Sequence, residues 1–392
     1  MNAAIYSQRN EHNGGVILRK VYQEDLKYIY EKLSEHPLFI IEESKKAVFD
    51  ALFNALNDRE IDYDAFINAI NRLTGFFCDG HTNMEMPYSS NDKALNIPCY
   101  WCGGKLLLKT DYMGVQKGAQ IVAVEHKTVD EIVLAMADRI SHENLFLVKS
   151  RMINYPYKNY HLFSEMTLRF LFGVQDEYTI SFALDGQTVE KSLKLEEYNG
   201  YLDFADDDFI YYEIEGDTAI LHLDSCICNE FYKNTLCELA DVCHKNKIST
   251  LILDLSKNMG GSSAVIDAFI KHTNTSKYRR YEMIDYSSGK PEHITKRTEL
   301  VKNSPHSKCF DLDIQCRVSY DTFSSARTFA VTLKDNKIAT RIIGMPTGGK
   351  PSSFGMPQRW RTPNCSIPFR VSRCLFLRPD RTGDAEIALY PD

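Results

Sequence analysis

Apolar residues recur every three to four positions over most of residues 21–77. Segments 21–33, 43–56 and 63–77 each place these residues on one face of a helix, with polar residues on the other. Asp62 or Asp64 is a candidate N-cap for the third helix. The pattern ends within "CDGHTNM", where Gly80 breaks it. The chain is therefore predicted to begin with a helical unit.

The next stretch alternates between β-rich and amphipathic segments. Strands are predicted at 104–110 and 119–129, and helices at 129–140 and 160–172. Residues 177–195 predict a β-hairpin, because an Asp-Gly pair at their centre suits a tight turn flanked by alternating residues. This mixture of short elements indicates a second unit.

From about residue 205, strands and helices alternate. The predicted order is a hairpin at 208–223, a helix at 230–246, a strand at 250–256, a helix at 263–273, a strand at 315–321, a helix at 324–336 and a strand at 339–344. The strand at 250–256 is almost continuously apolar, as expected of a strand buried on both faces. The alternation predicts a layered α/β unit.

Composition narrows the class of protein. The chain has 392 residues, 44% of them apolar, and a formal net charge of −7. It has no basic stripe, so we do not expect it to bind nucleic acid. No apolar run approaches the roughly 20 residues of a membrane span. Residues 1–15 lack the apolar stretch of a signal peptide, which predicts a cytoplasmic protein, although a trimmed secreted chain would look the same.

Cysteine usage points to reduced thiols. There are eleven cysteines, an odd number, without the spacing of a disulfide framework. Cys99 and Cys102 have the spacing of a redox or zinc pair, but zinc would need two further ligands, and no such set follows in the sequence. We expect two ordinary thiols in a strand and its turn. No metal and no cofactor are predicted.

Three short segments carry residues suited to chemistry. In "LILDLSKNMGGSS" a buried strand leads into adjacent glycines, whose amides can approach an anion or oxyanion closely. In "DTFSSARTFA" two serines lie at the start of a helix, where either a plain N-cap or an activated nucleophile is possible. In "FFCDGHT" a histidine follows glycine, and imidazole has the near-neutral pKa of a general base.

Together these segments resemble the C-terminal processing peptidases, also called tail-specific or tricorn-core serine peptidases. "DGHT" is similar to the same motif in that family, and "LILDLSKNMGGSS" to its "DLRxNxGG", with Ser256 in place of arginine. "TFSSARTFAVTLKDN" resembles "TxSxAExFAxxLKDN", "IIGMPTGGKPSSFG" resembles "GExTGGxPxxYG", and the chain closes on "PD" as the family does. The matches come in family order and span roughly residues 20–392.

The resemblance implies an α/β protein of three domains. They would be a helical N-terminal domain at 1–84, a PDZ-like middle domain at 85–200, and a crotonase/Clp-peptidase-like β/α catalytic core at 201–392. "KGAQIVAVEHKTVDEI" is similar to a PDZ segment, but Glu125 and His126 replace its usual Asn-Gly turn. The middle domain is therefore expected to be degenerate, or poor at holding a peptide end.

The resemblance also implies roles. Ser324, two residues after Thr322, takes the place of the nucleophile. Ser325 would give a backbone N–H to the oxyanion hole, with a second from Gly260 or Gly261. Arg327 stands where the family has glutamate, a departure whose effect the sequence does not reveal.

Two bases remain open at this point. One branch of the family uses a lysine, for which Lys350 is the candidate; it is one residue further from Ser324 than usual, and Phe354 replaces the glutamine partner. The other branch uses the histidine of "DGHT", oriented by a late acid. We favour Ser324, His81 and Glu386, with Asp384 and then Asp380 as the next candidates for the acid.

The predicted function is that of a serine endopeptidase acting on a peptide or protein through an acyl-enzyme. The alternative is a non-catalytic protein that binds a peptide or hydrophobic ligand on the same fold. The sequence carries no signal for the oligomeric state.

Overall fold

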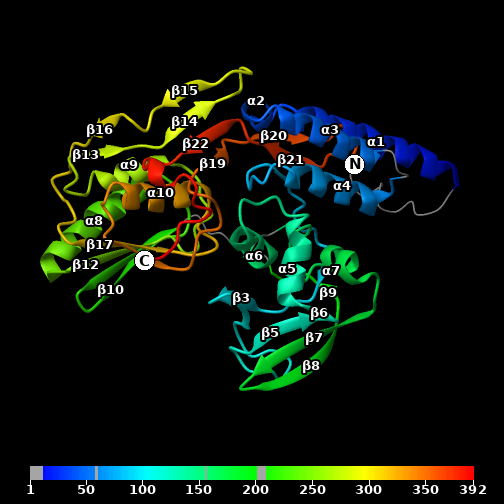
Figure 1. Cartoon of the computed structure of the whole chain (residues 1–392). Helices are drawn as coiled ribbons and strands as arrows, with labels where there is room; N and C mark the ends of the chain where they lie inside the picture. The colour runs from blue at the N-terminus through cyan, green and yellow to red at the C-terminus, as the bar shows by residue number, and fades with distance from the viewer. Residues whose placement is uncertain (1–11, 58–60, 155–156, 201–208) are drawn as a thin grey trace.

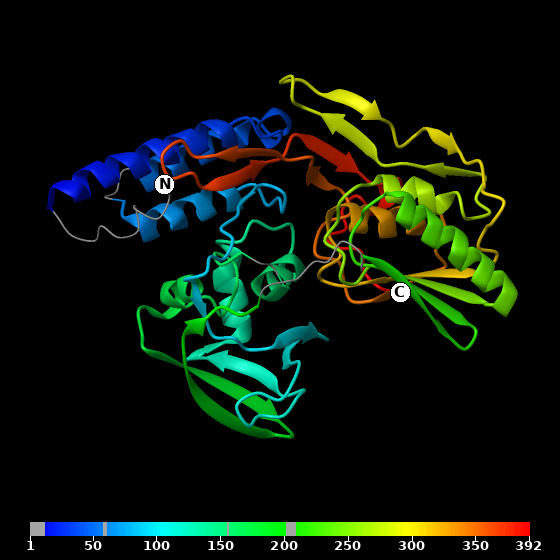
Figure 2. The same cartoon turned by 180° about the vertical axis from the view of Figure 1, so that it is seen from behind.

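The computed structural model describes residues 12–57, 61–154, 157–200 and 209–392, with side chains from residue 20 onward. Buried apolar residues form three clusters, one among the N-terminal helices, one in the middle of the chain and one in the C-terminal half. Figures 1 and 2 show the corresponding bodies from opposite sides.

Four helices form the N-terminal body: α1 His12–Leu33, α2 Leu38–Ile41, α3 Ser44–Asn57 and α4 Tyr63–Gly75. Helices α1, α3 and α4 confirm the three helices predicted here, and α2 was not predicted. Asp62 is the N-cap of α4, since its Oδ1 accepts the Ala65 N–H at 2.8 Å. Strands β20 Gln358–Arg361 and β21 Pro368–Val371, from the far end of the chain, complete this apolar cluster. Figure 1 shows them, in red, alongside the blue helices.

The middle body is built on one antiparallel sheet in the order β3-β4-β5-β7-β8, with β6 beside β5. The strands are β3 Cys99–Cys102, β4 Lys105–Leu108, β5 Gln120–Val124, β6 Lys127–Thr128, β7 Glu177–Leu184 and β8 Gln187–Lys194. The predicted hairpin turns at Asp185 and Gly186, whose φ angles of 51° and 80° suit its two-residue connection.

Three helices accompany this sheet: α5 Val129–Ala137, α6 Leu145–Asn154 and α7 Glu165–Phe172. The helix predicted from residue 160 begins only at Glu165, because Ser164 is its N-cap and accepts the Thr167 N–H. The short strands β2 Lys93–Ala94 and β9 Glu196–Glu197 pair with each other.

A five-stranded sheet forms the C-terminal core, in the order β10-β11-β12-β17-β18. Its strands are β10 Ile210–Glu215, β11 Thr218–Leu223, β12 Thr250–Asp254, β17 Asp313–Val318 and β18 Arg341–Gly344, and all but β10 run parallel. Helices α8 Glu230–Asn246, α9 Ala264–Ile270 and α10 Ser324–Asp335 share its apolar cluster (Figure 1). Because β12 and β17 are parallel neighbours, the loops that follow them meet at one edge of the sheet.

The remaining strands were not predicted. They are β1 Asn83–Met84, β13 Lys277–Arg279, β14 Glu282–Asp285, β15 Glu292–Thr295, β16 Leu300–Lys302, β19 Ser353–Gly355 and β22 Cys374–Leu377. Strand β21 pairs with β1, and β22, which follows closely, pairs with β14 and β19. Figure 1 shows this red segment running from the N-terminal helices to the core. It fixes the turn before β1 relative to the core.

Within these ranges no helix is long and apolar enough to cross a membrane. All eleven cysteines are free thiols, and Cys99 and Cys102 lie at the two ends of β3.

Candidate active site

Ser324 is the first residue of α10 and follows β17 through a tight turn. Its φ of 52° is in the left-handed region, where the backbone of any residue other than glycine is strained. The turn is fixed from within: Thr322 Oγ1 donates to Leu255 O at 2.8 Å, and the Phe323 N–H donates to Asn258 O at 3.1 Å. The strained serine is therefore held by the loop after the neighbouring strand.

His81 and Ser324 meet although 243 positions separate them in the sequence. The Ser324 Oγ and His81 Nε2 atoms are 2.9 Å apart, within hydrogen-bond distance. The imidazole stacks on the ring of Phe323, with centroids 4.6 Å apart and planes 28° from parallel. Two segments from different bodies thus form one hydroxyl–imidazole pair.

The "DGHT" turn positions His81 through close packing. Gly80 is required for this approach, because a Cβ at this residue would lie 2.6 Å from Leu147 Cδ2 and 2.8 Å from Phe323 Cζ. The carbonyl of Gly80 accepts hydrogen bonds from Arg151 and from Asn83 Nδ2. The glycine of the motif therefore brings the turn against the residue that precedes Ser324.

Asp79 is a fully buried carboxylate at the centre of a hydrogen-bond network. It accepts from Thr82 Oγ1 at 2.7 Å, from Ser372 Oγ at 2.6 Å and from the His81 backbone N–H at 2.9 Å. His36 Nε2 lies 3.2 Å from Asp79 Oδ2. The Leu38 N–H donates to His36 Nδ1, so Nε2 carries the His36 proton and donates it to Asp79.

Four donors stabilise the ionised form of Asp79. Burial raises the pKa of this carboxyl, but its hydrogen bonds and the two neighbouring imidazoles outweigh burial and hold the pKa well below 3.8. The Asp79 Oδ1 and His81 Nδ1 atoms are 3.6 Å apart, slightly beyond a hydrogen bond, and Nδ1 has no partner in the described part of the chain. Such contacts are often long before substrate binds.

His81 is neutral near pH 7. Burial lowers its pKa below 6.5, Asp79 opposes this shift, and the positive charges of Arg327 and Arg151 add to it. A neutral imidazole whose Nδ1 faces Asp79 can leave Nε2 unprotonated toward Ser324. This is the state in which a histidine accepts a proton from a serine hydroxyl.

The glycine corner, Gly260 and Gly261, lies directly against Ser324. A Cβ at Gly260 would be 2.6 Å from Ser324 Cβ and 3.1 Å from Ser325 N, and the φ angles of Gly260 and Gly261 are 110° and 135°. Gly260 donates its N–H to Asn258 Oδ1 at 2.8 Å. Gly261 donates its N–H to no group in the described ranges. Of the two glycines, Gly261 therefore has the amide that remains available.

The late acids do not reach the histidine, which corrects the expected contact with Glu386. Glu386 Oε2 lies 2.6 Å from Arg378 Nη1, and its side chain is 40% exposed. Asp384 pairs with Arg297 at 2.7 Å, and Asp380 caps a short 3₁₀ helix at Arg381–Gly383. These carboxylates pair with arginines or cap the start of the 3₁₀ helix. The acid that lies next to His81 is Asp79, two residues before it.

Lys350, the other candidate base, forms no hydrogen bond or ion pair among the described residues, and Ser324 Oγ is paired with His81 instead.

Glu143 was missed by sequence reasoning. One carboxylate oxygen of Glu143, one of Asp79 and one ring nitrogen of His81 lie within 4.8 Å of one another. The Gly80 N–H reaches Oε1 at 3.4 Å, whereas Oε2 is buried without a partner in the described structure. Burial raises the pKa of Glu143 to about 7. A single glutamate in "SHENL" gave no signal, since only the packing of α6 against the "DGHT" turn places it here.

Replacing Glu143 with glutamine should stabilise the protein at high pH. Burial raises the pKa of Glu143 from 4.5 to about 7. The Glu143 carboxyl therefore loses its proton at a lower pH in the unfolded chain than in the folded protein. As a result, the free energy of unfolding falls as the pH rises from about 4.5 to about 7. Glutamine is neutral at every pH and avoids this loss. The free energy of unfolding of Glu143→Gln relative to the wild type should therefore be higher by on the order of 3 kcal/mol at about pH 8 than at about pH 4.5.

Thermal unfolding at both pH values measures this gain, with exposed Glu43→Gln as the matched control. Equal effects of Glu143→Gln at the two pH values would contradict the account.

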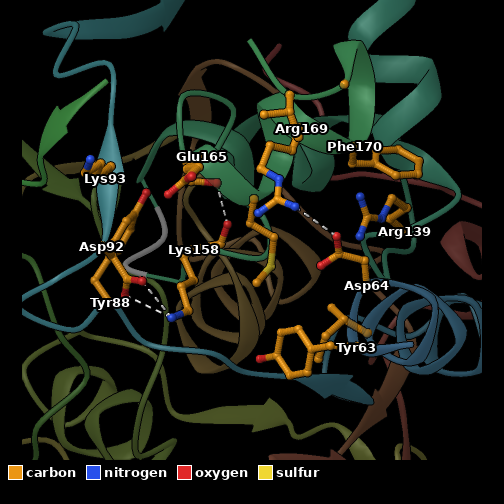
Figure 3. Close-up of a pocket in the computed structure, with 15 residues that line it drawn as sticks. Tyr63, Asp64, Tyr88, Asp92, Lys93, Arg139, Lys158, Glu165, Arg169 and Phe170 are labelled. Carbon is orange, nitrogen blue, oxygen red and sulfur yellow. Dashed lines mark hydrogen bonds and ion pairs between the residues drawn. The ribbon is translucent and has the colours of Figure 1, made fainter. Parts of the chain in front are cut away.

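A cavity of about 530 Å³ opens beside the pair and is lined by His81, Ser324, Ser325 and the glycine corner. A second cavity, of about 370 Å³, lies between α4 and α7 (Figure 3). Its serine, Ser164, is buried and donates to backbone carbonyls. In Figure 3 Arg169 points at Asp64 and Lys158 at Asp92. No histidine is among the residues that line the second cavity, whereas the first cavity contains the pair of Ser324 and His81.

A serine hydroxyl paired with a neutral histidine, beside available amides, defines a serine-type hydrolase. Residues 217–359 match the model of peptidase family S41. The solved structure of mature CPAF aligns with a TM-score of 0.70 at 15% identity, covering 96% of this chain and 92% of that one. CPAF complexed with lactacystin aligns with a TM-score of 0.68 at 15% identity, covering 96% and 93%. No curated protein sequence matches.

The chain is a serine peptidase with the mixed α/β fold of these enzymes. The motifs agree with this match, since residues 217–359 are similar to peptidase family S41 and include the Gly-Gly segment and the serine pair.

Proposed function

We propose that the protein is an endopeptidase in which Ser324 is the nucleophile, His81 the general base and Asp79 the group that orients His81. The 2.9 Å contact between Ser324 Oγ and His81 Nε2 carries the proposal. Asp79 replaces Glu386 because it lies beside His81 Nδ1, is fully buried and is held ionised. The amides of Ser325 and Gly261 form the oxyanion hole, since the Gly260 amide is already bound to Asn258.

The reaction follows from this arrangement. His81 Nε2 takes the Ser324 proton as Oγ attacks the carbonyl carbon of the scissile peptide. The two amides stabilise the negative oxygen that forms. The C–N bond breaks, and the proton passes from His81 to the leaving amine. Water then attacks the acyl-enzyme, loses its proton to His81 and releases the acid, after which Ser324 recovers its proton.

Labelling by a fluorophosphonate tests the proposal. We expect the probe to form a covalent adduct on Ser324, located by mass spectrometry of the tryptic peptide, and no adduct in Ser324→Ala. Lack of labelling in the folded wild-type protein would favour the alternative, a binding protein on a peptidase fold. A pure binder has no use for a strained serine against a neutral histidine.

The division into domains 1–84, 85–200 and 201–392 is also proposed, with the middle domain PDZ-like and the core of crotonase/Clp-peptidase type. Three separate apolar clusters support it, although the N-terminal cluster also takes Ile367, Phe369 and Val371. In the middle domain Glu125 occupies the turn with a φ of 52°, where PDZ segments have an Asn-Gly turn. Eleven free thiols support a reducing compartment such as the cytoplasm.

A further inference from the structure

One face of α10 forms a wall of the active-site cavity. Ser324, Arg327, Thr328 and Thr332 all line it. Arg327 and Thr328 follow Ser324 by three and four residues, and Thr332 follows Thr328 by four, which places them on one side of the helix. Apolar side chains, including Ile266, Phe354 and Phe376, form much of the remaining lining. The cavity starts at the nucleophile and at the Ser325 and Gly261 amides. The side chain next to an attacked carbonyl, P1, would enter it.

Arg327 is a buried cation without a counter-ion. Only 2% of its surface is exposed, and its Nε and Nη1 atoms are buried without a hydrogen-bond partner in the described ranges. No carboxylate of the described residues lies within ion-pair distance of its guanidinium. Buried arginines are ordinarily paired, because an unpaired buried charge is costly. An arginine of this kind in a binding cavity is poised for an anion supplied by the ligand.

The other charges that line the cavity cancel. Arg280 bonds to Asp267, with its Nε 3.2 Å from Oδ1, and the hydroxyl of Tyr278 also donates to Asp267. His81 is neutral near pH 7. Glu143 feels the charge of Arg327 but forms no ion pair with it. Among the residues that line the cavity, Arg327 is therefore the positive charge without an ion-pair partner.

We propose that Arg327 makes this cavity a P1 subsite for an acidic side chain, so that the enzyme cleaves after aspartate or glutamate. A carboxylate there would accept charge-assisted hydrogen bonds from the guanidinium in a site shielded from water. The motif that this segment resembles has glutamate at position 327, so the arginine reverses the charge of that position. The inference rests on the proposed peptidase function and adds its substrate class.

The test uses the full chain and a library of peptides from a tryptic digest of a bacterial proteome, with cut sites read by mass spectrometry. We expect aspartate and glutamate to be enriched at P1. Two fluorogenic peptides that differ only in glutamate or glutamine at P1 then give a ratio of kcat/KM, which we expect to exceed about tenfold in favour of glutamate. Half of the library carries amidated C-termini, to separate an acidic side chain from a terminal carboxylate.

Variants assign the effect to Arg327. Arg327→Met should bring the glutamate-to-glutamine ratio close to one while fluorophosphonate labelling of Ser324 persists. Arg327→Lys should keep part of the preference. Arg279→Met is the matched control, because it removes an exposed arginine of β13 that does not line the cavity, and its ratio should stay that of the wild type.

The possible failures are distinguishable. A wild-type protein that is neither labelled nor active would refute the peptidase proposal and this inference with it. Labelling and cleavage without acidic P1 enrichment would overturn this inference alone. So would enrichment at P1′, cleavage only next to free C-termini, or an unchanged ratio in Arg327→Met. Should Arg327→Met not fold, as judged by circular dichroism, the wild-type ratio and that of Arg327→Lys decide.

Discussion

Replacing Ser324 with alanine is expected to lower kcat/KM for peptide hydrolysis by about 10⁴-fold or more, to the level left by binding and the oxyanion hole. The hydroxyl that His81 contacts at 2.9 Å is the atom that would bond to the substrate carbonyl. Alanine leaves the fold intact, because the turn is held by Thr322 and Asn258 and not by this hydroxyl. Hydrolysis of a quenched fluorescent peptide, at matched thermal stability, measures the loss.

Ser325→Ala is the matched control. The hydroxyl of Ser325 is exposed and donates to Gly261 O at 2.7 Å, whereas its proposed contribution is the backbone N–H, which alanine retains. We expect activity within about tenfold of the wild type. If Ser325→Ala lost activity and Ser324→Ala kept it, the nucleophile would be Ser325.

Replacing Asp79 with asparagine should lower kcat by about 10³–10⁴-fold, a loss typical of a triad whose histidine is left in the wrong tautomer. An asparagine amide can donate to His81 Nδ1, which would place the imidazole proton on Nε2, toward Ser324. Asparagine also puts an NH₂ group among donors from His36, Thr82 and Ser372, so a lower melting temperature is expected as well. Kinetics far below that melting temperature separate the two effects.

Glu386→Gln serves as the comparison, since this residue was the acid first expected. Its carboxylate pairs with Arg378, so the change should reduce stability modestly and leave kcat within a few-fold of the wild type. A large loss of kcat in Glu386→Gln with near-normal Asp79→Asn would return the orienting role to Glu386.

Local patterns were sufficient for most helices and for the core strands. The three-to-four spacing before residue 77 gave α1, α3 and α4, and the alternation after residue 205 gave the parallel strands and α8–α10. These elements are determined by which side of a short segment is apolar. The strands between 277 and 302 and between 353 and 377 were missed, because they are short and many face solvent on one side.

The carboxylate beside His81 could not be identified from the sequence. Asp79 was present in the "DGHT" motif, two residues from His81, and its network needs Ser372 and His36 from distant segments. Glu386 lies near the chain end, where the family pattern suggests an acid, but its carboxylate forms an ion pair with Arg378. Such pairings depend on which charged groups are buried together, and burial is a property of the packed chain.

The sequence by itself predicted the peptidase resemblance, the segments that hold the candidate chemistry and the residues Ser324 and His81. These predictions rest on short motifs, since the serine pair, the Gly-Gly segment and the Asp-Gly-His segment each span only a few residues. Only the tertiary structure brought Ser324 and His81 to 2.9 Å, through the pairing of β1 with β21 and the continuation into β22. Only burial left Arg327 uncompensated, because neighbours from several elements exclude both water and a counter-ion from it.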